Sequence, residues 1–215
     1  MPARDSDTHD PARAALRIDA TAVCATRLAR VAGTHALLLG AHTGAPALPG
    51  VANWTVLQPA PHGTGWRGPL HADTSPLPFG DDSFCAVLVC FTGAEVAPES
   101  IAGELSRVLA PHGVLLVTDM HPRSLWHSDS VSPGRWERAL RAADLKVAPA
   151  MRCGAPWPRA QGVEGMPHWL VRGLGGAYVI EARRRTLAAI PLRKTTAKRH
   201  AVEHNLLPGA RRQCA

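Results

Sequence analysis

The fold is decided by two stretches, residues 70–91, LHADTSPLPFGDDSFCAVLVCF, and residues 104–126, ELSRVLAPHGVLLVTDMHPRSLW. The apolar runs Phe84–Cys90 and Val114–Thr118 predict two buried strands. Between them, residues 98–109 predict a helix, because a proline opens the segment and apolar residues recur at helical spacing. This order is that of a βαβ unit, whose loops at the carboxyl ends of the strands are where open α/β sheets bind ligands.

Upstream of this unit, the sequence predicts a leading helix and a first strand. Asp10 and Pro11 suit the N-cap and the first helical position. Apolar residues then recur close to helical spacing until Gly33, which ends the pattern. The run His35–Gly40, which is apolar after its first residue and ends in glycine, predicts a buried parallel strand.

The rest of the chain continues the alternation of strands and helices. Trp54–Leu57 predicts a short second strand, and the residues after it predict a loop through position 68. Downstream we expect a helix over Arg135–Ala143, a strand over Lys146–Met151 and, after a long irregular segment, a late strand over Ala177–Arg183. The pattern predicts an α/β fold with a Rossmann-like, doubly wound, mostly parallel sheet whose last strand is antiparallel.

Basic residues are concentrated at the carboxyl end. From Glu181 onward, nine Arg and Lys residues stand against two Glu residues, which accounts for the whole formal net charge of +7. We therefore divide the chain into an N-terminal helical cap (1–33), one main domain (34–186) and a basic C-terminal tail (187–215).

Composition favours a cytoplasmic protein. The five cysteines are scattered and form no Cys-x-x-Cys pair, which is typical of a reducing compartment. The first residues carry acids and lack an apolar core, so we expect no signal peptide. No apolar run approaches the roughly 20 residues that cross a bilayer, so we expect no membrane association.

The motifs in the deciding stretches allow a family comparison. The Asp-x-x-x-Leu-Pro-Phe element that begins at Asp73, and the Arg-Val-Leu-x-Pro-x-Gly turn that begins at Arg107, resemble class I S-adenosylmethionine-dependent methyltransferases, in their type 11 branch. The resemblance covers roughly residues 35–185. It implies that the cofactor is S-adenosylmethionine and that a methyl group is transferred to an unidentified acceptor.

The resemblance implies cofactor contacts in the loop after the first strand. The family pattern there is an acid followed by three glycines at alternate positions. Gly40 and Gly44 match the outer glycines, His42 stands at the central one, and Leu38 stands in place of the acid. Glycines let the backbone approach a cofactor closely, although Gly40 and Gly44 can equally be turn glycines.

Two further contacts are implied beyond this loop. The family holds the ribose hydroxyls with an acid at the end of the second strand, where this chain has Gln58. Asp73 matches the residue that accepts a hydrogen bond from the adenine amino group, and its neighbour Thr74 is included in the same site. Alternatively, Asp73 caps the turn that follows it.

Asp119 and His121 are the candidates for contact with the methyl acceptor. Both follow the strand Val114–Thr118 on the expected ligand side, where either residue can accept a proton. The alternative is that they satisfy local backbone groups. A sulfonium is already an activated methyl donor, so alignment carries most of the catalysis and a strong catalytic signature is not expected. His200 and His204 have helical spacing but lack a third ligand, so no metal site is predicted.

A second functional hypothesis comes from the departures at Leu38 and Gln58. A catalytically inactive methyltransferase-like domain would bind RNA or a protein partner through its basic tail. Arg183–Arg185 and Lys194–Arg199 are the cations that would contact phosphates. The alternative for this tail is an exposed cationic end with no specific partner.

Overall fold

The computed structural model describes residues 10–41, 46, 48–60, 65–73, 75–126 and 130–185. The basic tail 187–215, and with it the prediction of its role, lies outside the described residues. The elements in chain order are α1 (Pro11–Leu28), β1 (Gly33–Gly40), β2 (Val51–Pro59), β3 (Trp66–Arg67), β4 (His71–Ala72), β5 (Phe84–Cys90), the single 3-10 turn η1 (Gly93–Glu95), α2 (Pro98–Val108), β6 (Leu109–Met120), α3 (Pro133–Ala142), β7 (Leu145–Val147), β8 (Met151–Cys153), α4 (His168–Leu174) and β9 (Ala177–Arg184).

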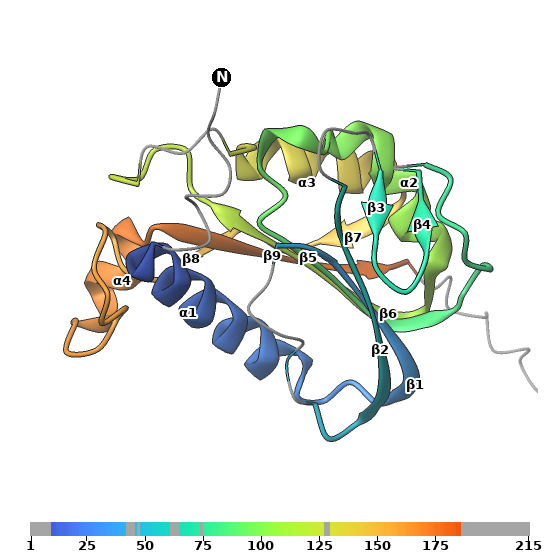
Figure 1. The fold of residues 1–215 in the computed structure, drawn as a ribbon, viewed down its shortest axis with the longest axis horizontal. Helices are drawn as coiled ribbons and strands as arrows, with labels where there is room; N and C mark the ends of the chain where they lie inside the picture. Colours follow the sequence, from blue (N-terminus) through green and yellow to red (C-terminus); the bar gives the residue numbers. More distant parts are fainter. Residues whose placement is uncertain are drawn as a thin grey trace, which may run out of the picture.

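All the strands belong to one mixed sheet, with helices on both faces (Figure 1). The strand order is β4-β3-β2-β1-β5-β6-β9-β7, and β8 also pairs with β9. The central strands β2, β1, β5 and β6 are parallel to one another, and β9 runs antiparallel to β6. The predicted doubly wound sheet with an antiparallel last strand is confirmed.

Helix α1 forms where the capping signal predicts it. The Asp10 side chain accepts a hydrogen bond from the backbone N–H of Ala12 at 2.9 Å, and Pro11 occupies the first turn. One side of the helix is buried, through residues at helical spacing: Ala12, Leu16, Ala20, Cys24 and Leu28. This side packs against β6, β8 and β9, so α1 covers one face of the sheet.

Helices α2 and α3 cover the opposite face (Figure 1). Alternate residues of each central strand point to the two faces, so Val87 and Val89 of β5 pack under α2 and α3 while Leu88 packs on the α1 side. The predicted apolar positions of α2, including Ile101 and Leu105, are fully buried. The apolar sequence of the central strands is therefore explained by burial on both faces.

Several local predictions are wrong. The segment predicted as a loop after β2 contains β3, which pairs antiparallel with the end of β2, and β2 itself is longer than predicted. The strand predicted over Lys146–Met151 is split into β7 and β8, which pair with different parts of β9. The segment predicted as irregular contains α4, in which no residue is fully buried.

The link between the parallel strands β1 and β2 positions the candidate site. Its described residues, 41, 46 and 48–50, are not helical, in keeping with the prolines at 46 and 49. After β2 the chain turns back through β3 and β4, which extend the sheet sideways.

Within the described residues, no helix has the length and apolar character needed to cross a membrane.

Candidate functional site

The strand register brings three predicted cofactor residues to one edge of the sheet. Leu39 pairs with Leu57, so Gly40 and Gln58 lie at the same level at the carboxyl ends of β1 and β2. Trp66 of β3 pairs with Pro59 and with Ala72, so Asp73, directly after β4, lies at this edge as well. Neighbouring strands are about 5 Å apart, so Gly40 and Asp73 are separated by about 14 Å across the sheet. His42, Gly44 and Thr74 lie outside the described residues.

The requirement for glycine at position 40 is explained by strand packing. Gly40 has a φ of +113°, a conformation that other residues rarely adopt. A Cβ atom added at Gly40 would overlap the carbonyl oxygen of Cys90 at the end of β5. The close approach of β1 to β5 therefore requires this glycine whether or not a cofactor binds beside it.

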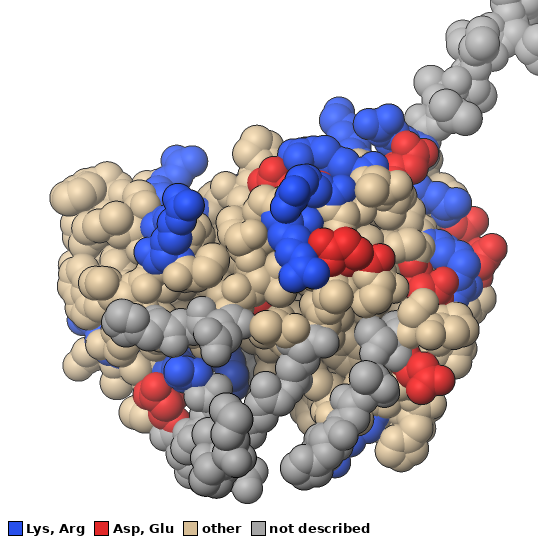
Figure 2. Space-filling model, turned by 90° about the horizontal axis from the view of Figure 1, so that it is seen from above, with Lys and Arg blue, Asp and Glu red and all other residues tan. Residues whose placement is uncertain are grey.

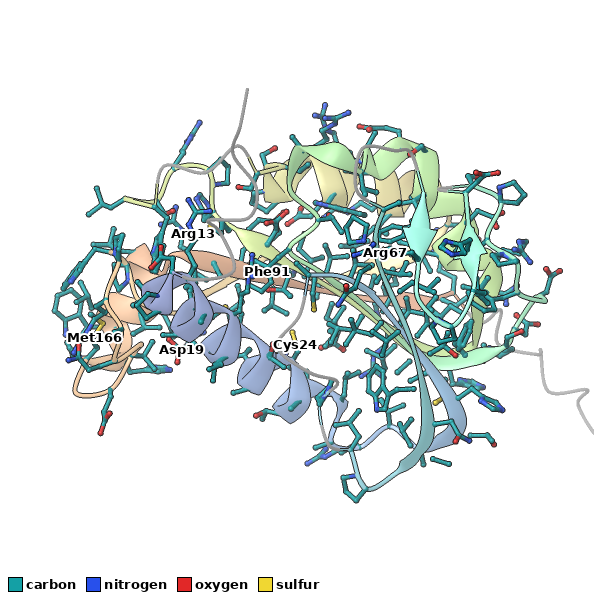
Figure 3. The ribbon with its side chains drawn as sticks, in the orientation of Figure 1. Arg13, Asp19, Cys24, Arg67, Phe91 and Met166 are labelled. Carbon is teal, nitrogen blue, oxygen red and sulfur yellow. The ribbon has the colours of Figure 1, made fainter. Side chains whose placement is uncertain are left out.

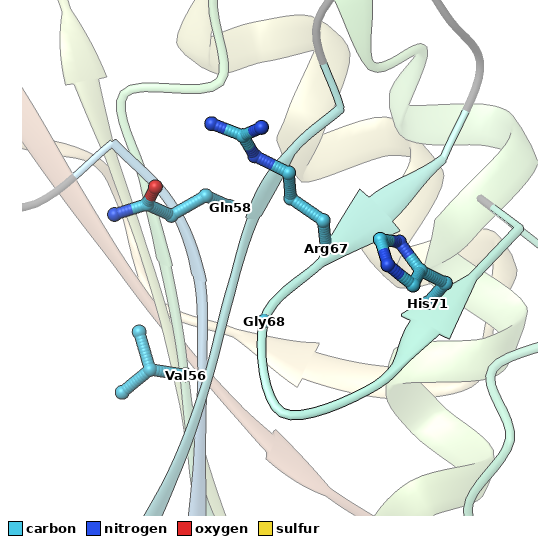
Figure 4. A pocket seen from close by; sticks show the side chains of 5 residues that line it. All are labelled: Val56, Gln58, Arg67, Gly68 and His71. Carbon is cyan, nitrogen blue, oxygen red and sulfur yellow. The ribbon is translucent and has the colours of Figure 1, made fainter.

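A cavity of about 410 Å³ lies beside Gln58 and was not predicted from the sequence (Figure 4). Gln58 is directly opposite Arg67, and Arg67 is directly opposite His71, so the three side chains form a row on one face of β2, β3 and β4. Val56 and Gly68 complete the lining. A Cβ atom at Gly68 would overlap the carbonyl oxygen of Val56, so this glycine lets the β3–β4 turn lie close against β2.

The polar groups at this edge are available to a ligand. The side chains of Gln58, Arg67, His71 and Asp73 make no hydrogen bond or ion pair within the part of the chain that the structure describes. Gln58 and Asp73 are both exposed. An amide offers a donor and an acceptor, and a carboxylate offers acceptors alone. The pair can therefore bind a hydroxyl group and an amino group of one ligand.

Asp119 is buried at the end of β6, with a side-chain environment that differs from that of Asp73. Its residue exposure is 3%. One carboxylate oxygen accepts a hydrogen bond from the N–H of Gly93 at 3.1 Å, and the other accepts one from the N–H of Met120 at 2.7 Å. Burial raises the pKa of the Asp119 carboxyl to about 7, against the lowering effect of these two N–H groups and of Arg17. Asp119 therefore titrates near neutral pH.

His121 follows β6 and is held by cationic neighbours. Its Nδ1 atom accepts a hydrogen bond from the N–H of Arg123 at 3.1 Å, and the Arg152 guanidinium lies 3.1 Å from Nε2. Burial, followed by the charges of Arg152 and Arg123, lowers the pKa of the imidazole. The ring is therefore a weaker base than an ordinary histidine, and its Nδ1 lone pair is already engaged.

The same edge contains residues that sequence reasoning missed. The Arg17 guanidinium of α1 lies 5.7 Å from the centroid of the Phe91 ring, which is placed beside α1 in Figure 3. Phe91 has a φ of +47° and directly follows β5. A bulky residue rarely adopts a positive φ, and no sequence pattern around Phe91 predicts this conformation. Arg17 lies on the polar side of the amphipathic helix α1, where the sequence pattern does not distinguish it from the other polar residues.

The edge fits S-adenosylmethionine in part. Asp73 and Gln58 would hold its adenosine portion by hydrogen bonds to the adenine amino group and a ribose hydroxyl. Leu38, at the position where the resembled family pattern has an acid, is fully buried and offers no polar contact. Gln58, at the position where the resembled family pattern has an acid for the ribose, is neutral, and an amide binds a hydroxyl less strongly than a carboxylate does.

No family model and no curated protein matches the sequence. Solved structures share the fold. A proposed methyltransferase from Bacillus halodurans C-125 aligns with a TM-score of 0.50 and 15% identity over 76% of this chain and 98% of its own. The (4+2)-cyclase SpnF aligns with a TM-score of 0.49 and 17% identity over 78% and 80% of the two chains. An S-adenosylmethionine-dependent methyltransferase from Mesorhizobium loti gives 0.47 and 14% over 82% and 99%. At such identities, the first likeness supports the Rossmann-like fold alone.

Proposed function

We propose that this protein is an S-adenosylmethionine-dependent methyltransferase acting on an unidentified acceptor. The observation that carries the proposal is the shared edge. Gly40 and Gln58 lie at the carboxyl ends of β1 and β2, Asp73 directly follows β4 at the same edge, and the side chains of Gln58 and Asp73 are exposed without a partner among the described residues.

The residues at the edge would bind and align the reactants. When bound, S-adenosylmethionine supplies an activated methyl group on its sulfonium sulfur. Asp73 accepts a hydrogen bond from the adenine amino group, and Gln58 binds a ribose hydroxyl. Asp119, with a pKa of about 7, takes a proton from the acceptor near neutral pH. The remaining catalysis is alignment of donor and acceptor.

Calorimetric titration of the full chain with S-adenosylmethionine and S-adenosylhomocysteine tests the cofactor assignment. The unmodified protein is expected to bind both, and Asp73→Asn is expected to bind roughly tenfold more weakly, because the hydrogen bond from the adenine amino group then has a neutral acceptor in place of a charged one. Glu164→Gln is the matched control, since Glu164 is also an exposed carboxylate that lies in another part of the chain. Absence of binding of either ligand at millimolar concentration would overturn the proposal.

Turnover requires a separate measurement. Incubation with methyl-labelled S-adenosylmethionine and fractionated small molecules, RNA and protein is expected to transfer label into one class of acceptor. Asp119→Asn is expected to lower the transfer rate above pH 7 more than it lowers cofactor affinity, because the residue is assigned to the acceptor. Equal losses of both would instead place Asp119 in cofactor binding.

A further inference from the structure

A second cavity lies at the opposite edge of the sheet, at the amino ends of the central strands. Its volume is about 550 Å³. Three arginines from two parts of the chain line it: Arg27 in α1, Arg30 just after α1, and Arg183 in β9. The cavity is also lined by His112, which precedes the apolar part of β6, and by Cys85, near the start of β5.

Positive charge exceeds negative charge around this cavity. Arg27 and Arg183 both contact the carboxylate of Glu181, at 3.4 Å and 2.9 Å. Arg30 is exposed and makes no hydrogen bond or ion pair within the described part of the chain. Arg27 and Arg183 therefore share one carboxylate and Arg30 contacts none among the described residues, which leaves two uncompensated positive charges beside the cavity.

Several arginines elsewhere in the described structure are paired with carboxylates, although Arg67 and Arg138 are not. Arg107 contacts both Glu104 and Asp81, and Arg184 and Arg185 contact Asp82 and Asp144. On the face covered by α2 and α3, basic and acidic side chains also lie next to one another (Figure 2). At the second cavity, three guanidinium groups line one cavity, and among the described residues only the Glu181 carboxylate contacts any of them.

We propose that this cavity binds a phosphate group, carried either by a nucleotide or by a nucleic-acid strand. Guanidinium groups bind phosphate oxygens through paired N–H donors, and three of them line one cavity here. The site is separate from the proposed cofactor edge. Cys85 lies near the start of β5 and Cys90 at its end, so the two edges are about 16 Å apart along that strand. Phosphate binding therefore leaves the cofactor edge open.

A purely structural role for the same arginines makes different predictions. Helix α1 ends at Leu28, and cations near a helix C-terminus stabilise the negative end of its dipole. Arg27 in the last turn meets this need. Arg30 lies beyond the helix and contacts no carboxylate among the described residues, so its removal separates phosphate binding from helix stability.

The test measures affinity of the full chain for inorganic phosphate, pyrophosphate, AMP and a single-stranded RNA oligonucleotide. Arg30→Ala is expected to weaken binding roughly tenfold with an unchanged melting temperature, and Arg30→Glu is expected to weaken it further. Arg138→Ala, at an exposed arginine of α3, is the matched control and is expected to behave as the unmodified protein. Stronger binding of AMP than of RNA identifies a nucleotide site, whereas RNA affinity that falls steeply with salt identifies a strand.

Cys85 provides a local readout. In a Cys214→Ser background, alkylation of Cys85 is expected to slow when phosphate is present, while the thiols of Cys24, Cys90 and Cys153 stay buried and unreactive. The proposal is overturned if Arg30→Ala binds every phosphate probe as well as the unmodified protein, if no probe binds, or if phosphate competes with S-adenosylmethionine. Failure to bind S-adenosylmethionine would overturn the proposed function and leave this test intact.

Discussion

Replacement of Asp119 with asparagine tests the electrostatic account of the candidate site. Asp119 is buried and accepts two backbone hydrogen bonds, from Gly93 and Met120. Asparagine has nearly the same shape and resembles the protonated carboxyl group, which cannot accept both bonds as well as a carboxylate does. The variant therefore fixes the side chain in its neutral form at every pH. Comparison of the two proteins isolates the cost of ionising Asp119 inside the fold.

The size and sign of the effect follow from the pKa values. The Asp119 pKa is about 7 in the folded protein and about 3.9 in an unfolded chain. Because the folded pKa is raised, the contribution of the carboxyl group to stability is complete below about pH 4. It is lost as the pH rises toward the folded pKa. Three pKa units correspond to about 4 kcal/mol. Relative to Asp119→Asn, the unmodified protein is thus expected to lose about 4 kcal/mol between pH 4 and pH 7.5.

Urea denaturation of both proteins at several pH values between 4 and 8 gives this difference directly. The contributions of other titrating groups cancel in the comparison, provided that the variant leaves them unchanged. A difference that stays constant within about 0.5 kcal/mol would refute the reasoning. So would a gain in stability of the unmodified protein at high pH, which would mean that the Arg17 charge outweighs burial and lowers the pKa.

Three further predictions concern single positions. Gly40→Ala is expected to destabilise the protein by more than about 2 kcal/mol in urea denaturation, because its Cβ atom would overlap the Cys90 carbonyl oxygen; a loss below about 0.5 kcal/mol would show that the end of β1 relaxes freely. Gln58→Glu is expected to strengthen S-adenosylmethionine binding roughly fivefold in calorimetry. The gain is expected to be larger in combination with Arg67→Gln, because the new carboxylate then has no guanidinium opposite it to pair with. A lack of gain in both variants would contradict the ribose contact. Asp10→Ala is expected to cost about 1 kcal/mol through loss of the α1 cap, measured by thermal unfolding, and an unchanged melting temperature would show that the cap is dispensable.

The main elements were predictable because burial on both faces produces long apolar runs. The strand Phe84–Cys90 was predicted with its observed bounds, and α2 was predicted from the spacing of its buried side. Strands β3 and β4 were missed because two residues cannot display an alternating pattern, and their pairing depends on partners elsewhere in the chain. Helix α4 was missed because none of its residues is fully buried, so it carries no apolar stripe.

The candidate site was predictable as a set of positions but not as an environment. The sequence indicated that Asp119 follows a buried strand, yet one of the N–H groups that its carboxylate accepts from belongs to Gly93, which lies 26 residues away. Likewise, nothing near Gln58 in the sequence indicates that Arg67 and His71 line a cavity with it, because only the antiparallel register of β3 aligns the three. The pKa values and the available hydrogen-bond donors of the site are set by residues that tertiary pairing brings close. Local sequence patterns do not identify these residues.

The register of β2 and β3 also gives a physical reason for a neutral residue at position 58. Position 58 is directly opposite Arg67, where side chains of paired strands are about 5 Å apart. A carboxylate at 58 would pair with the guanidinium and would have fewer lone pairs available for a ribose. The neutral amide of Gln58 does not form such an ion pair, and both side chains stay free in the described structure. Gln58 and Arg67 therefore belong to one arrangement, and under the proposed function the main contact to adenosine at this edge would come from the unpaired carboxylate of Asp73.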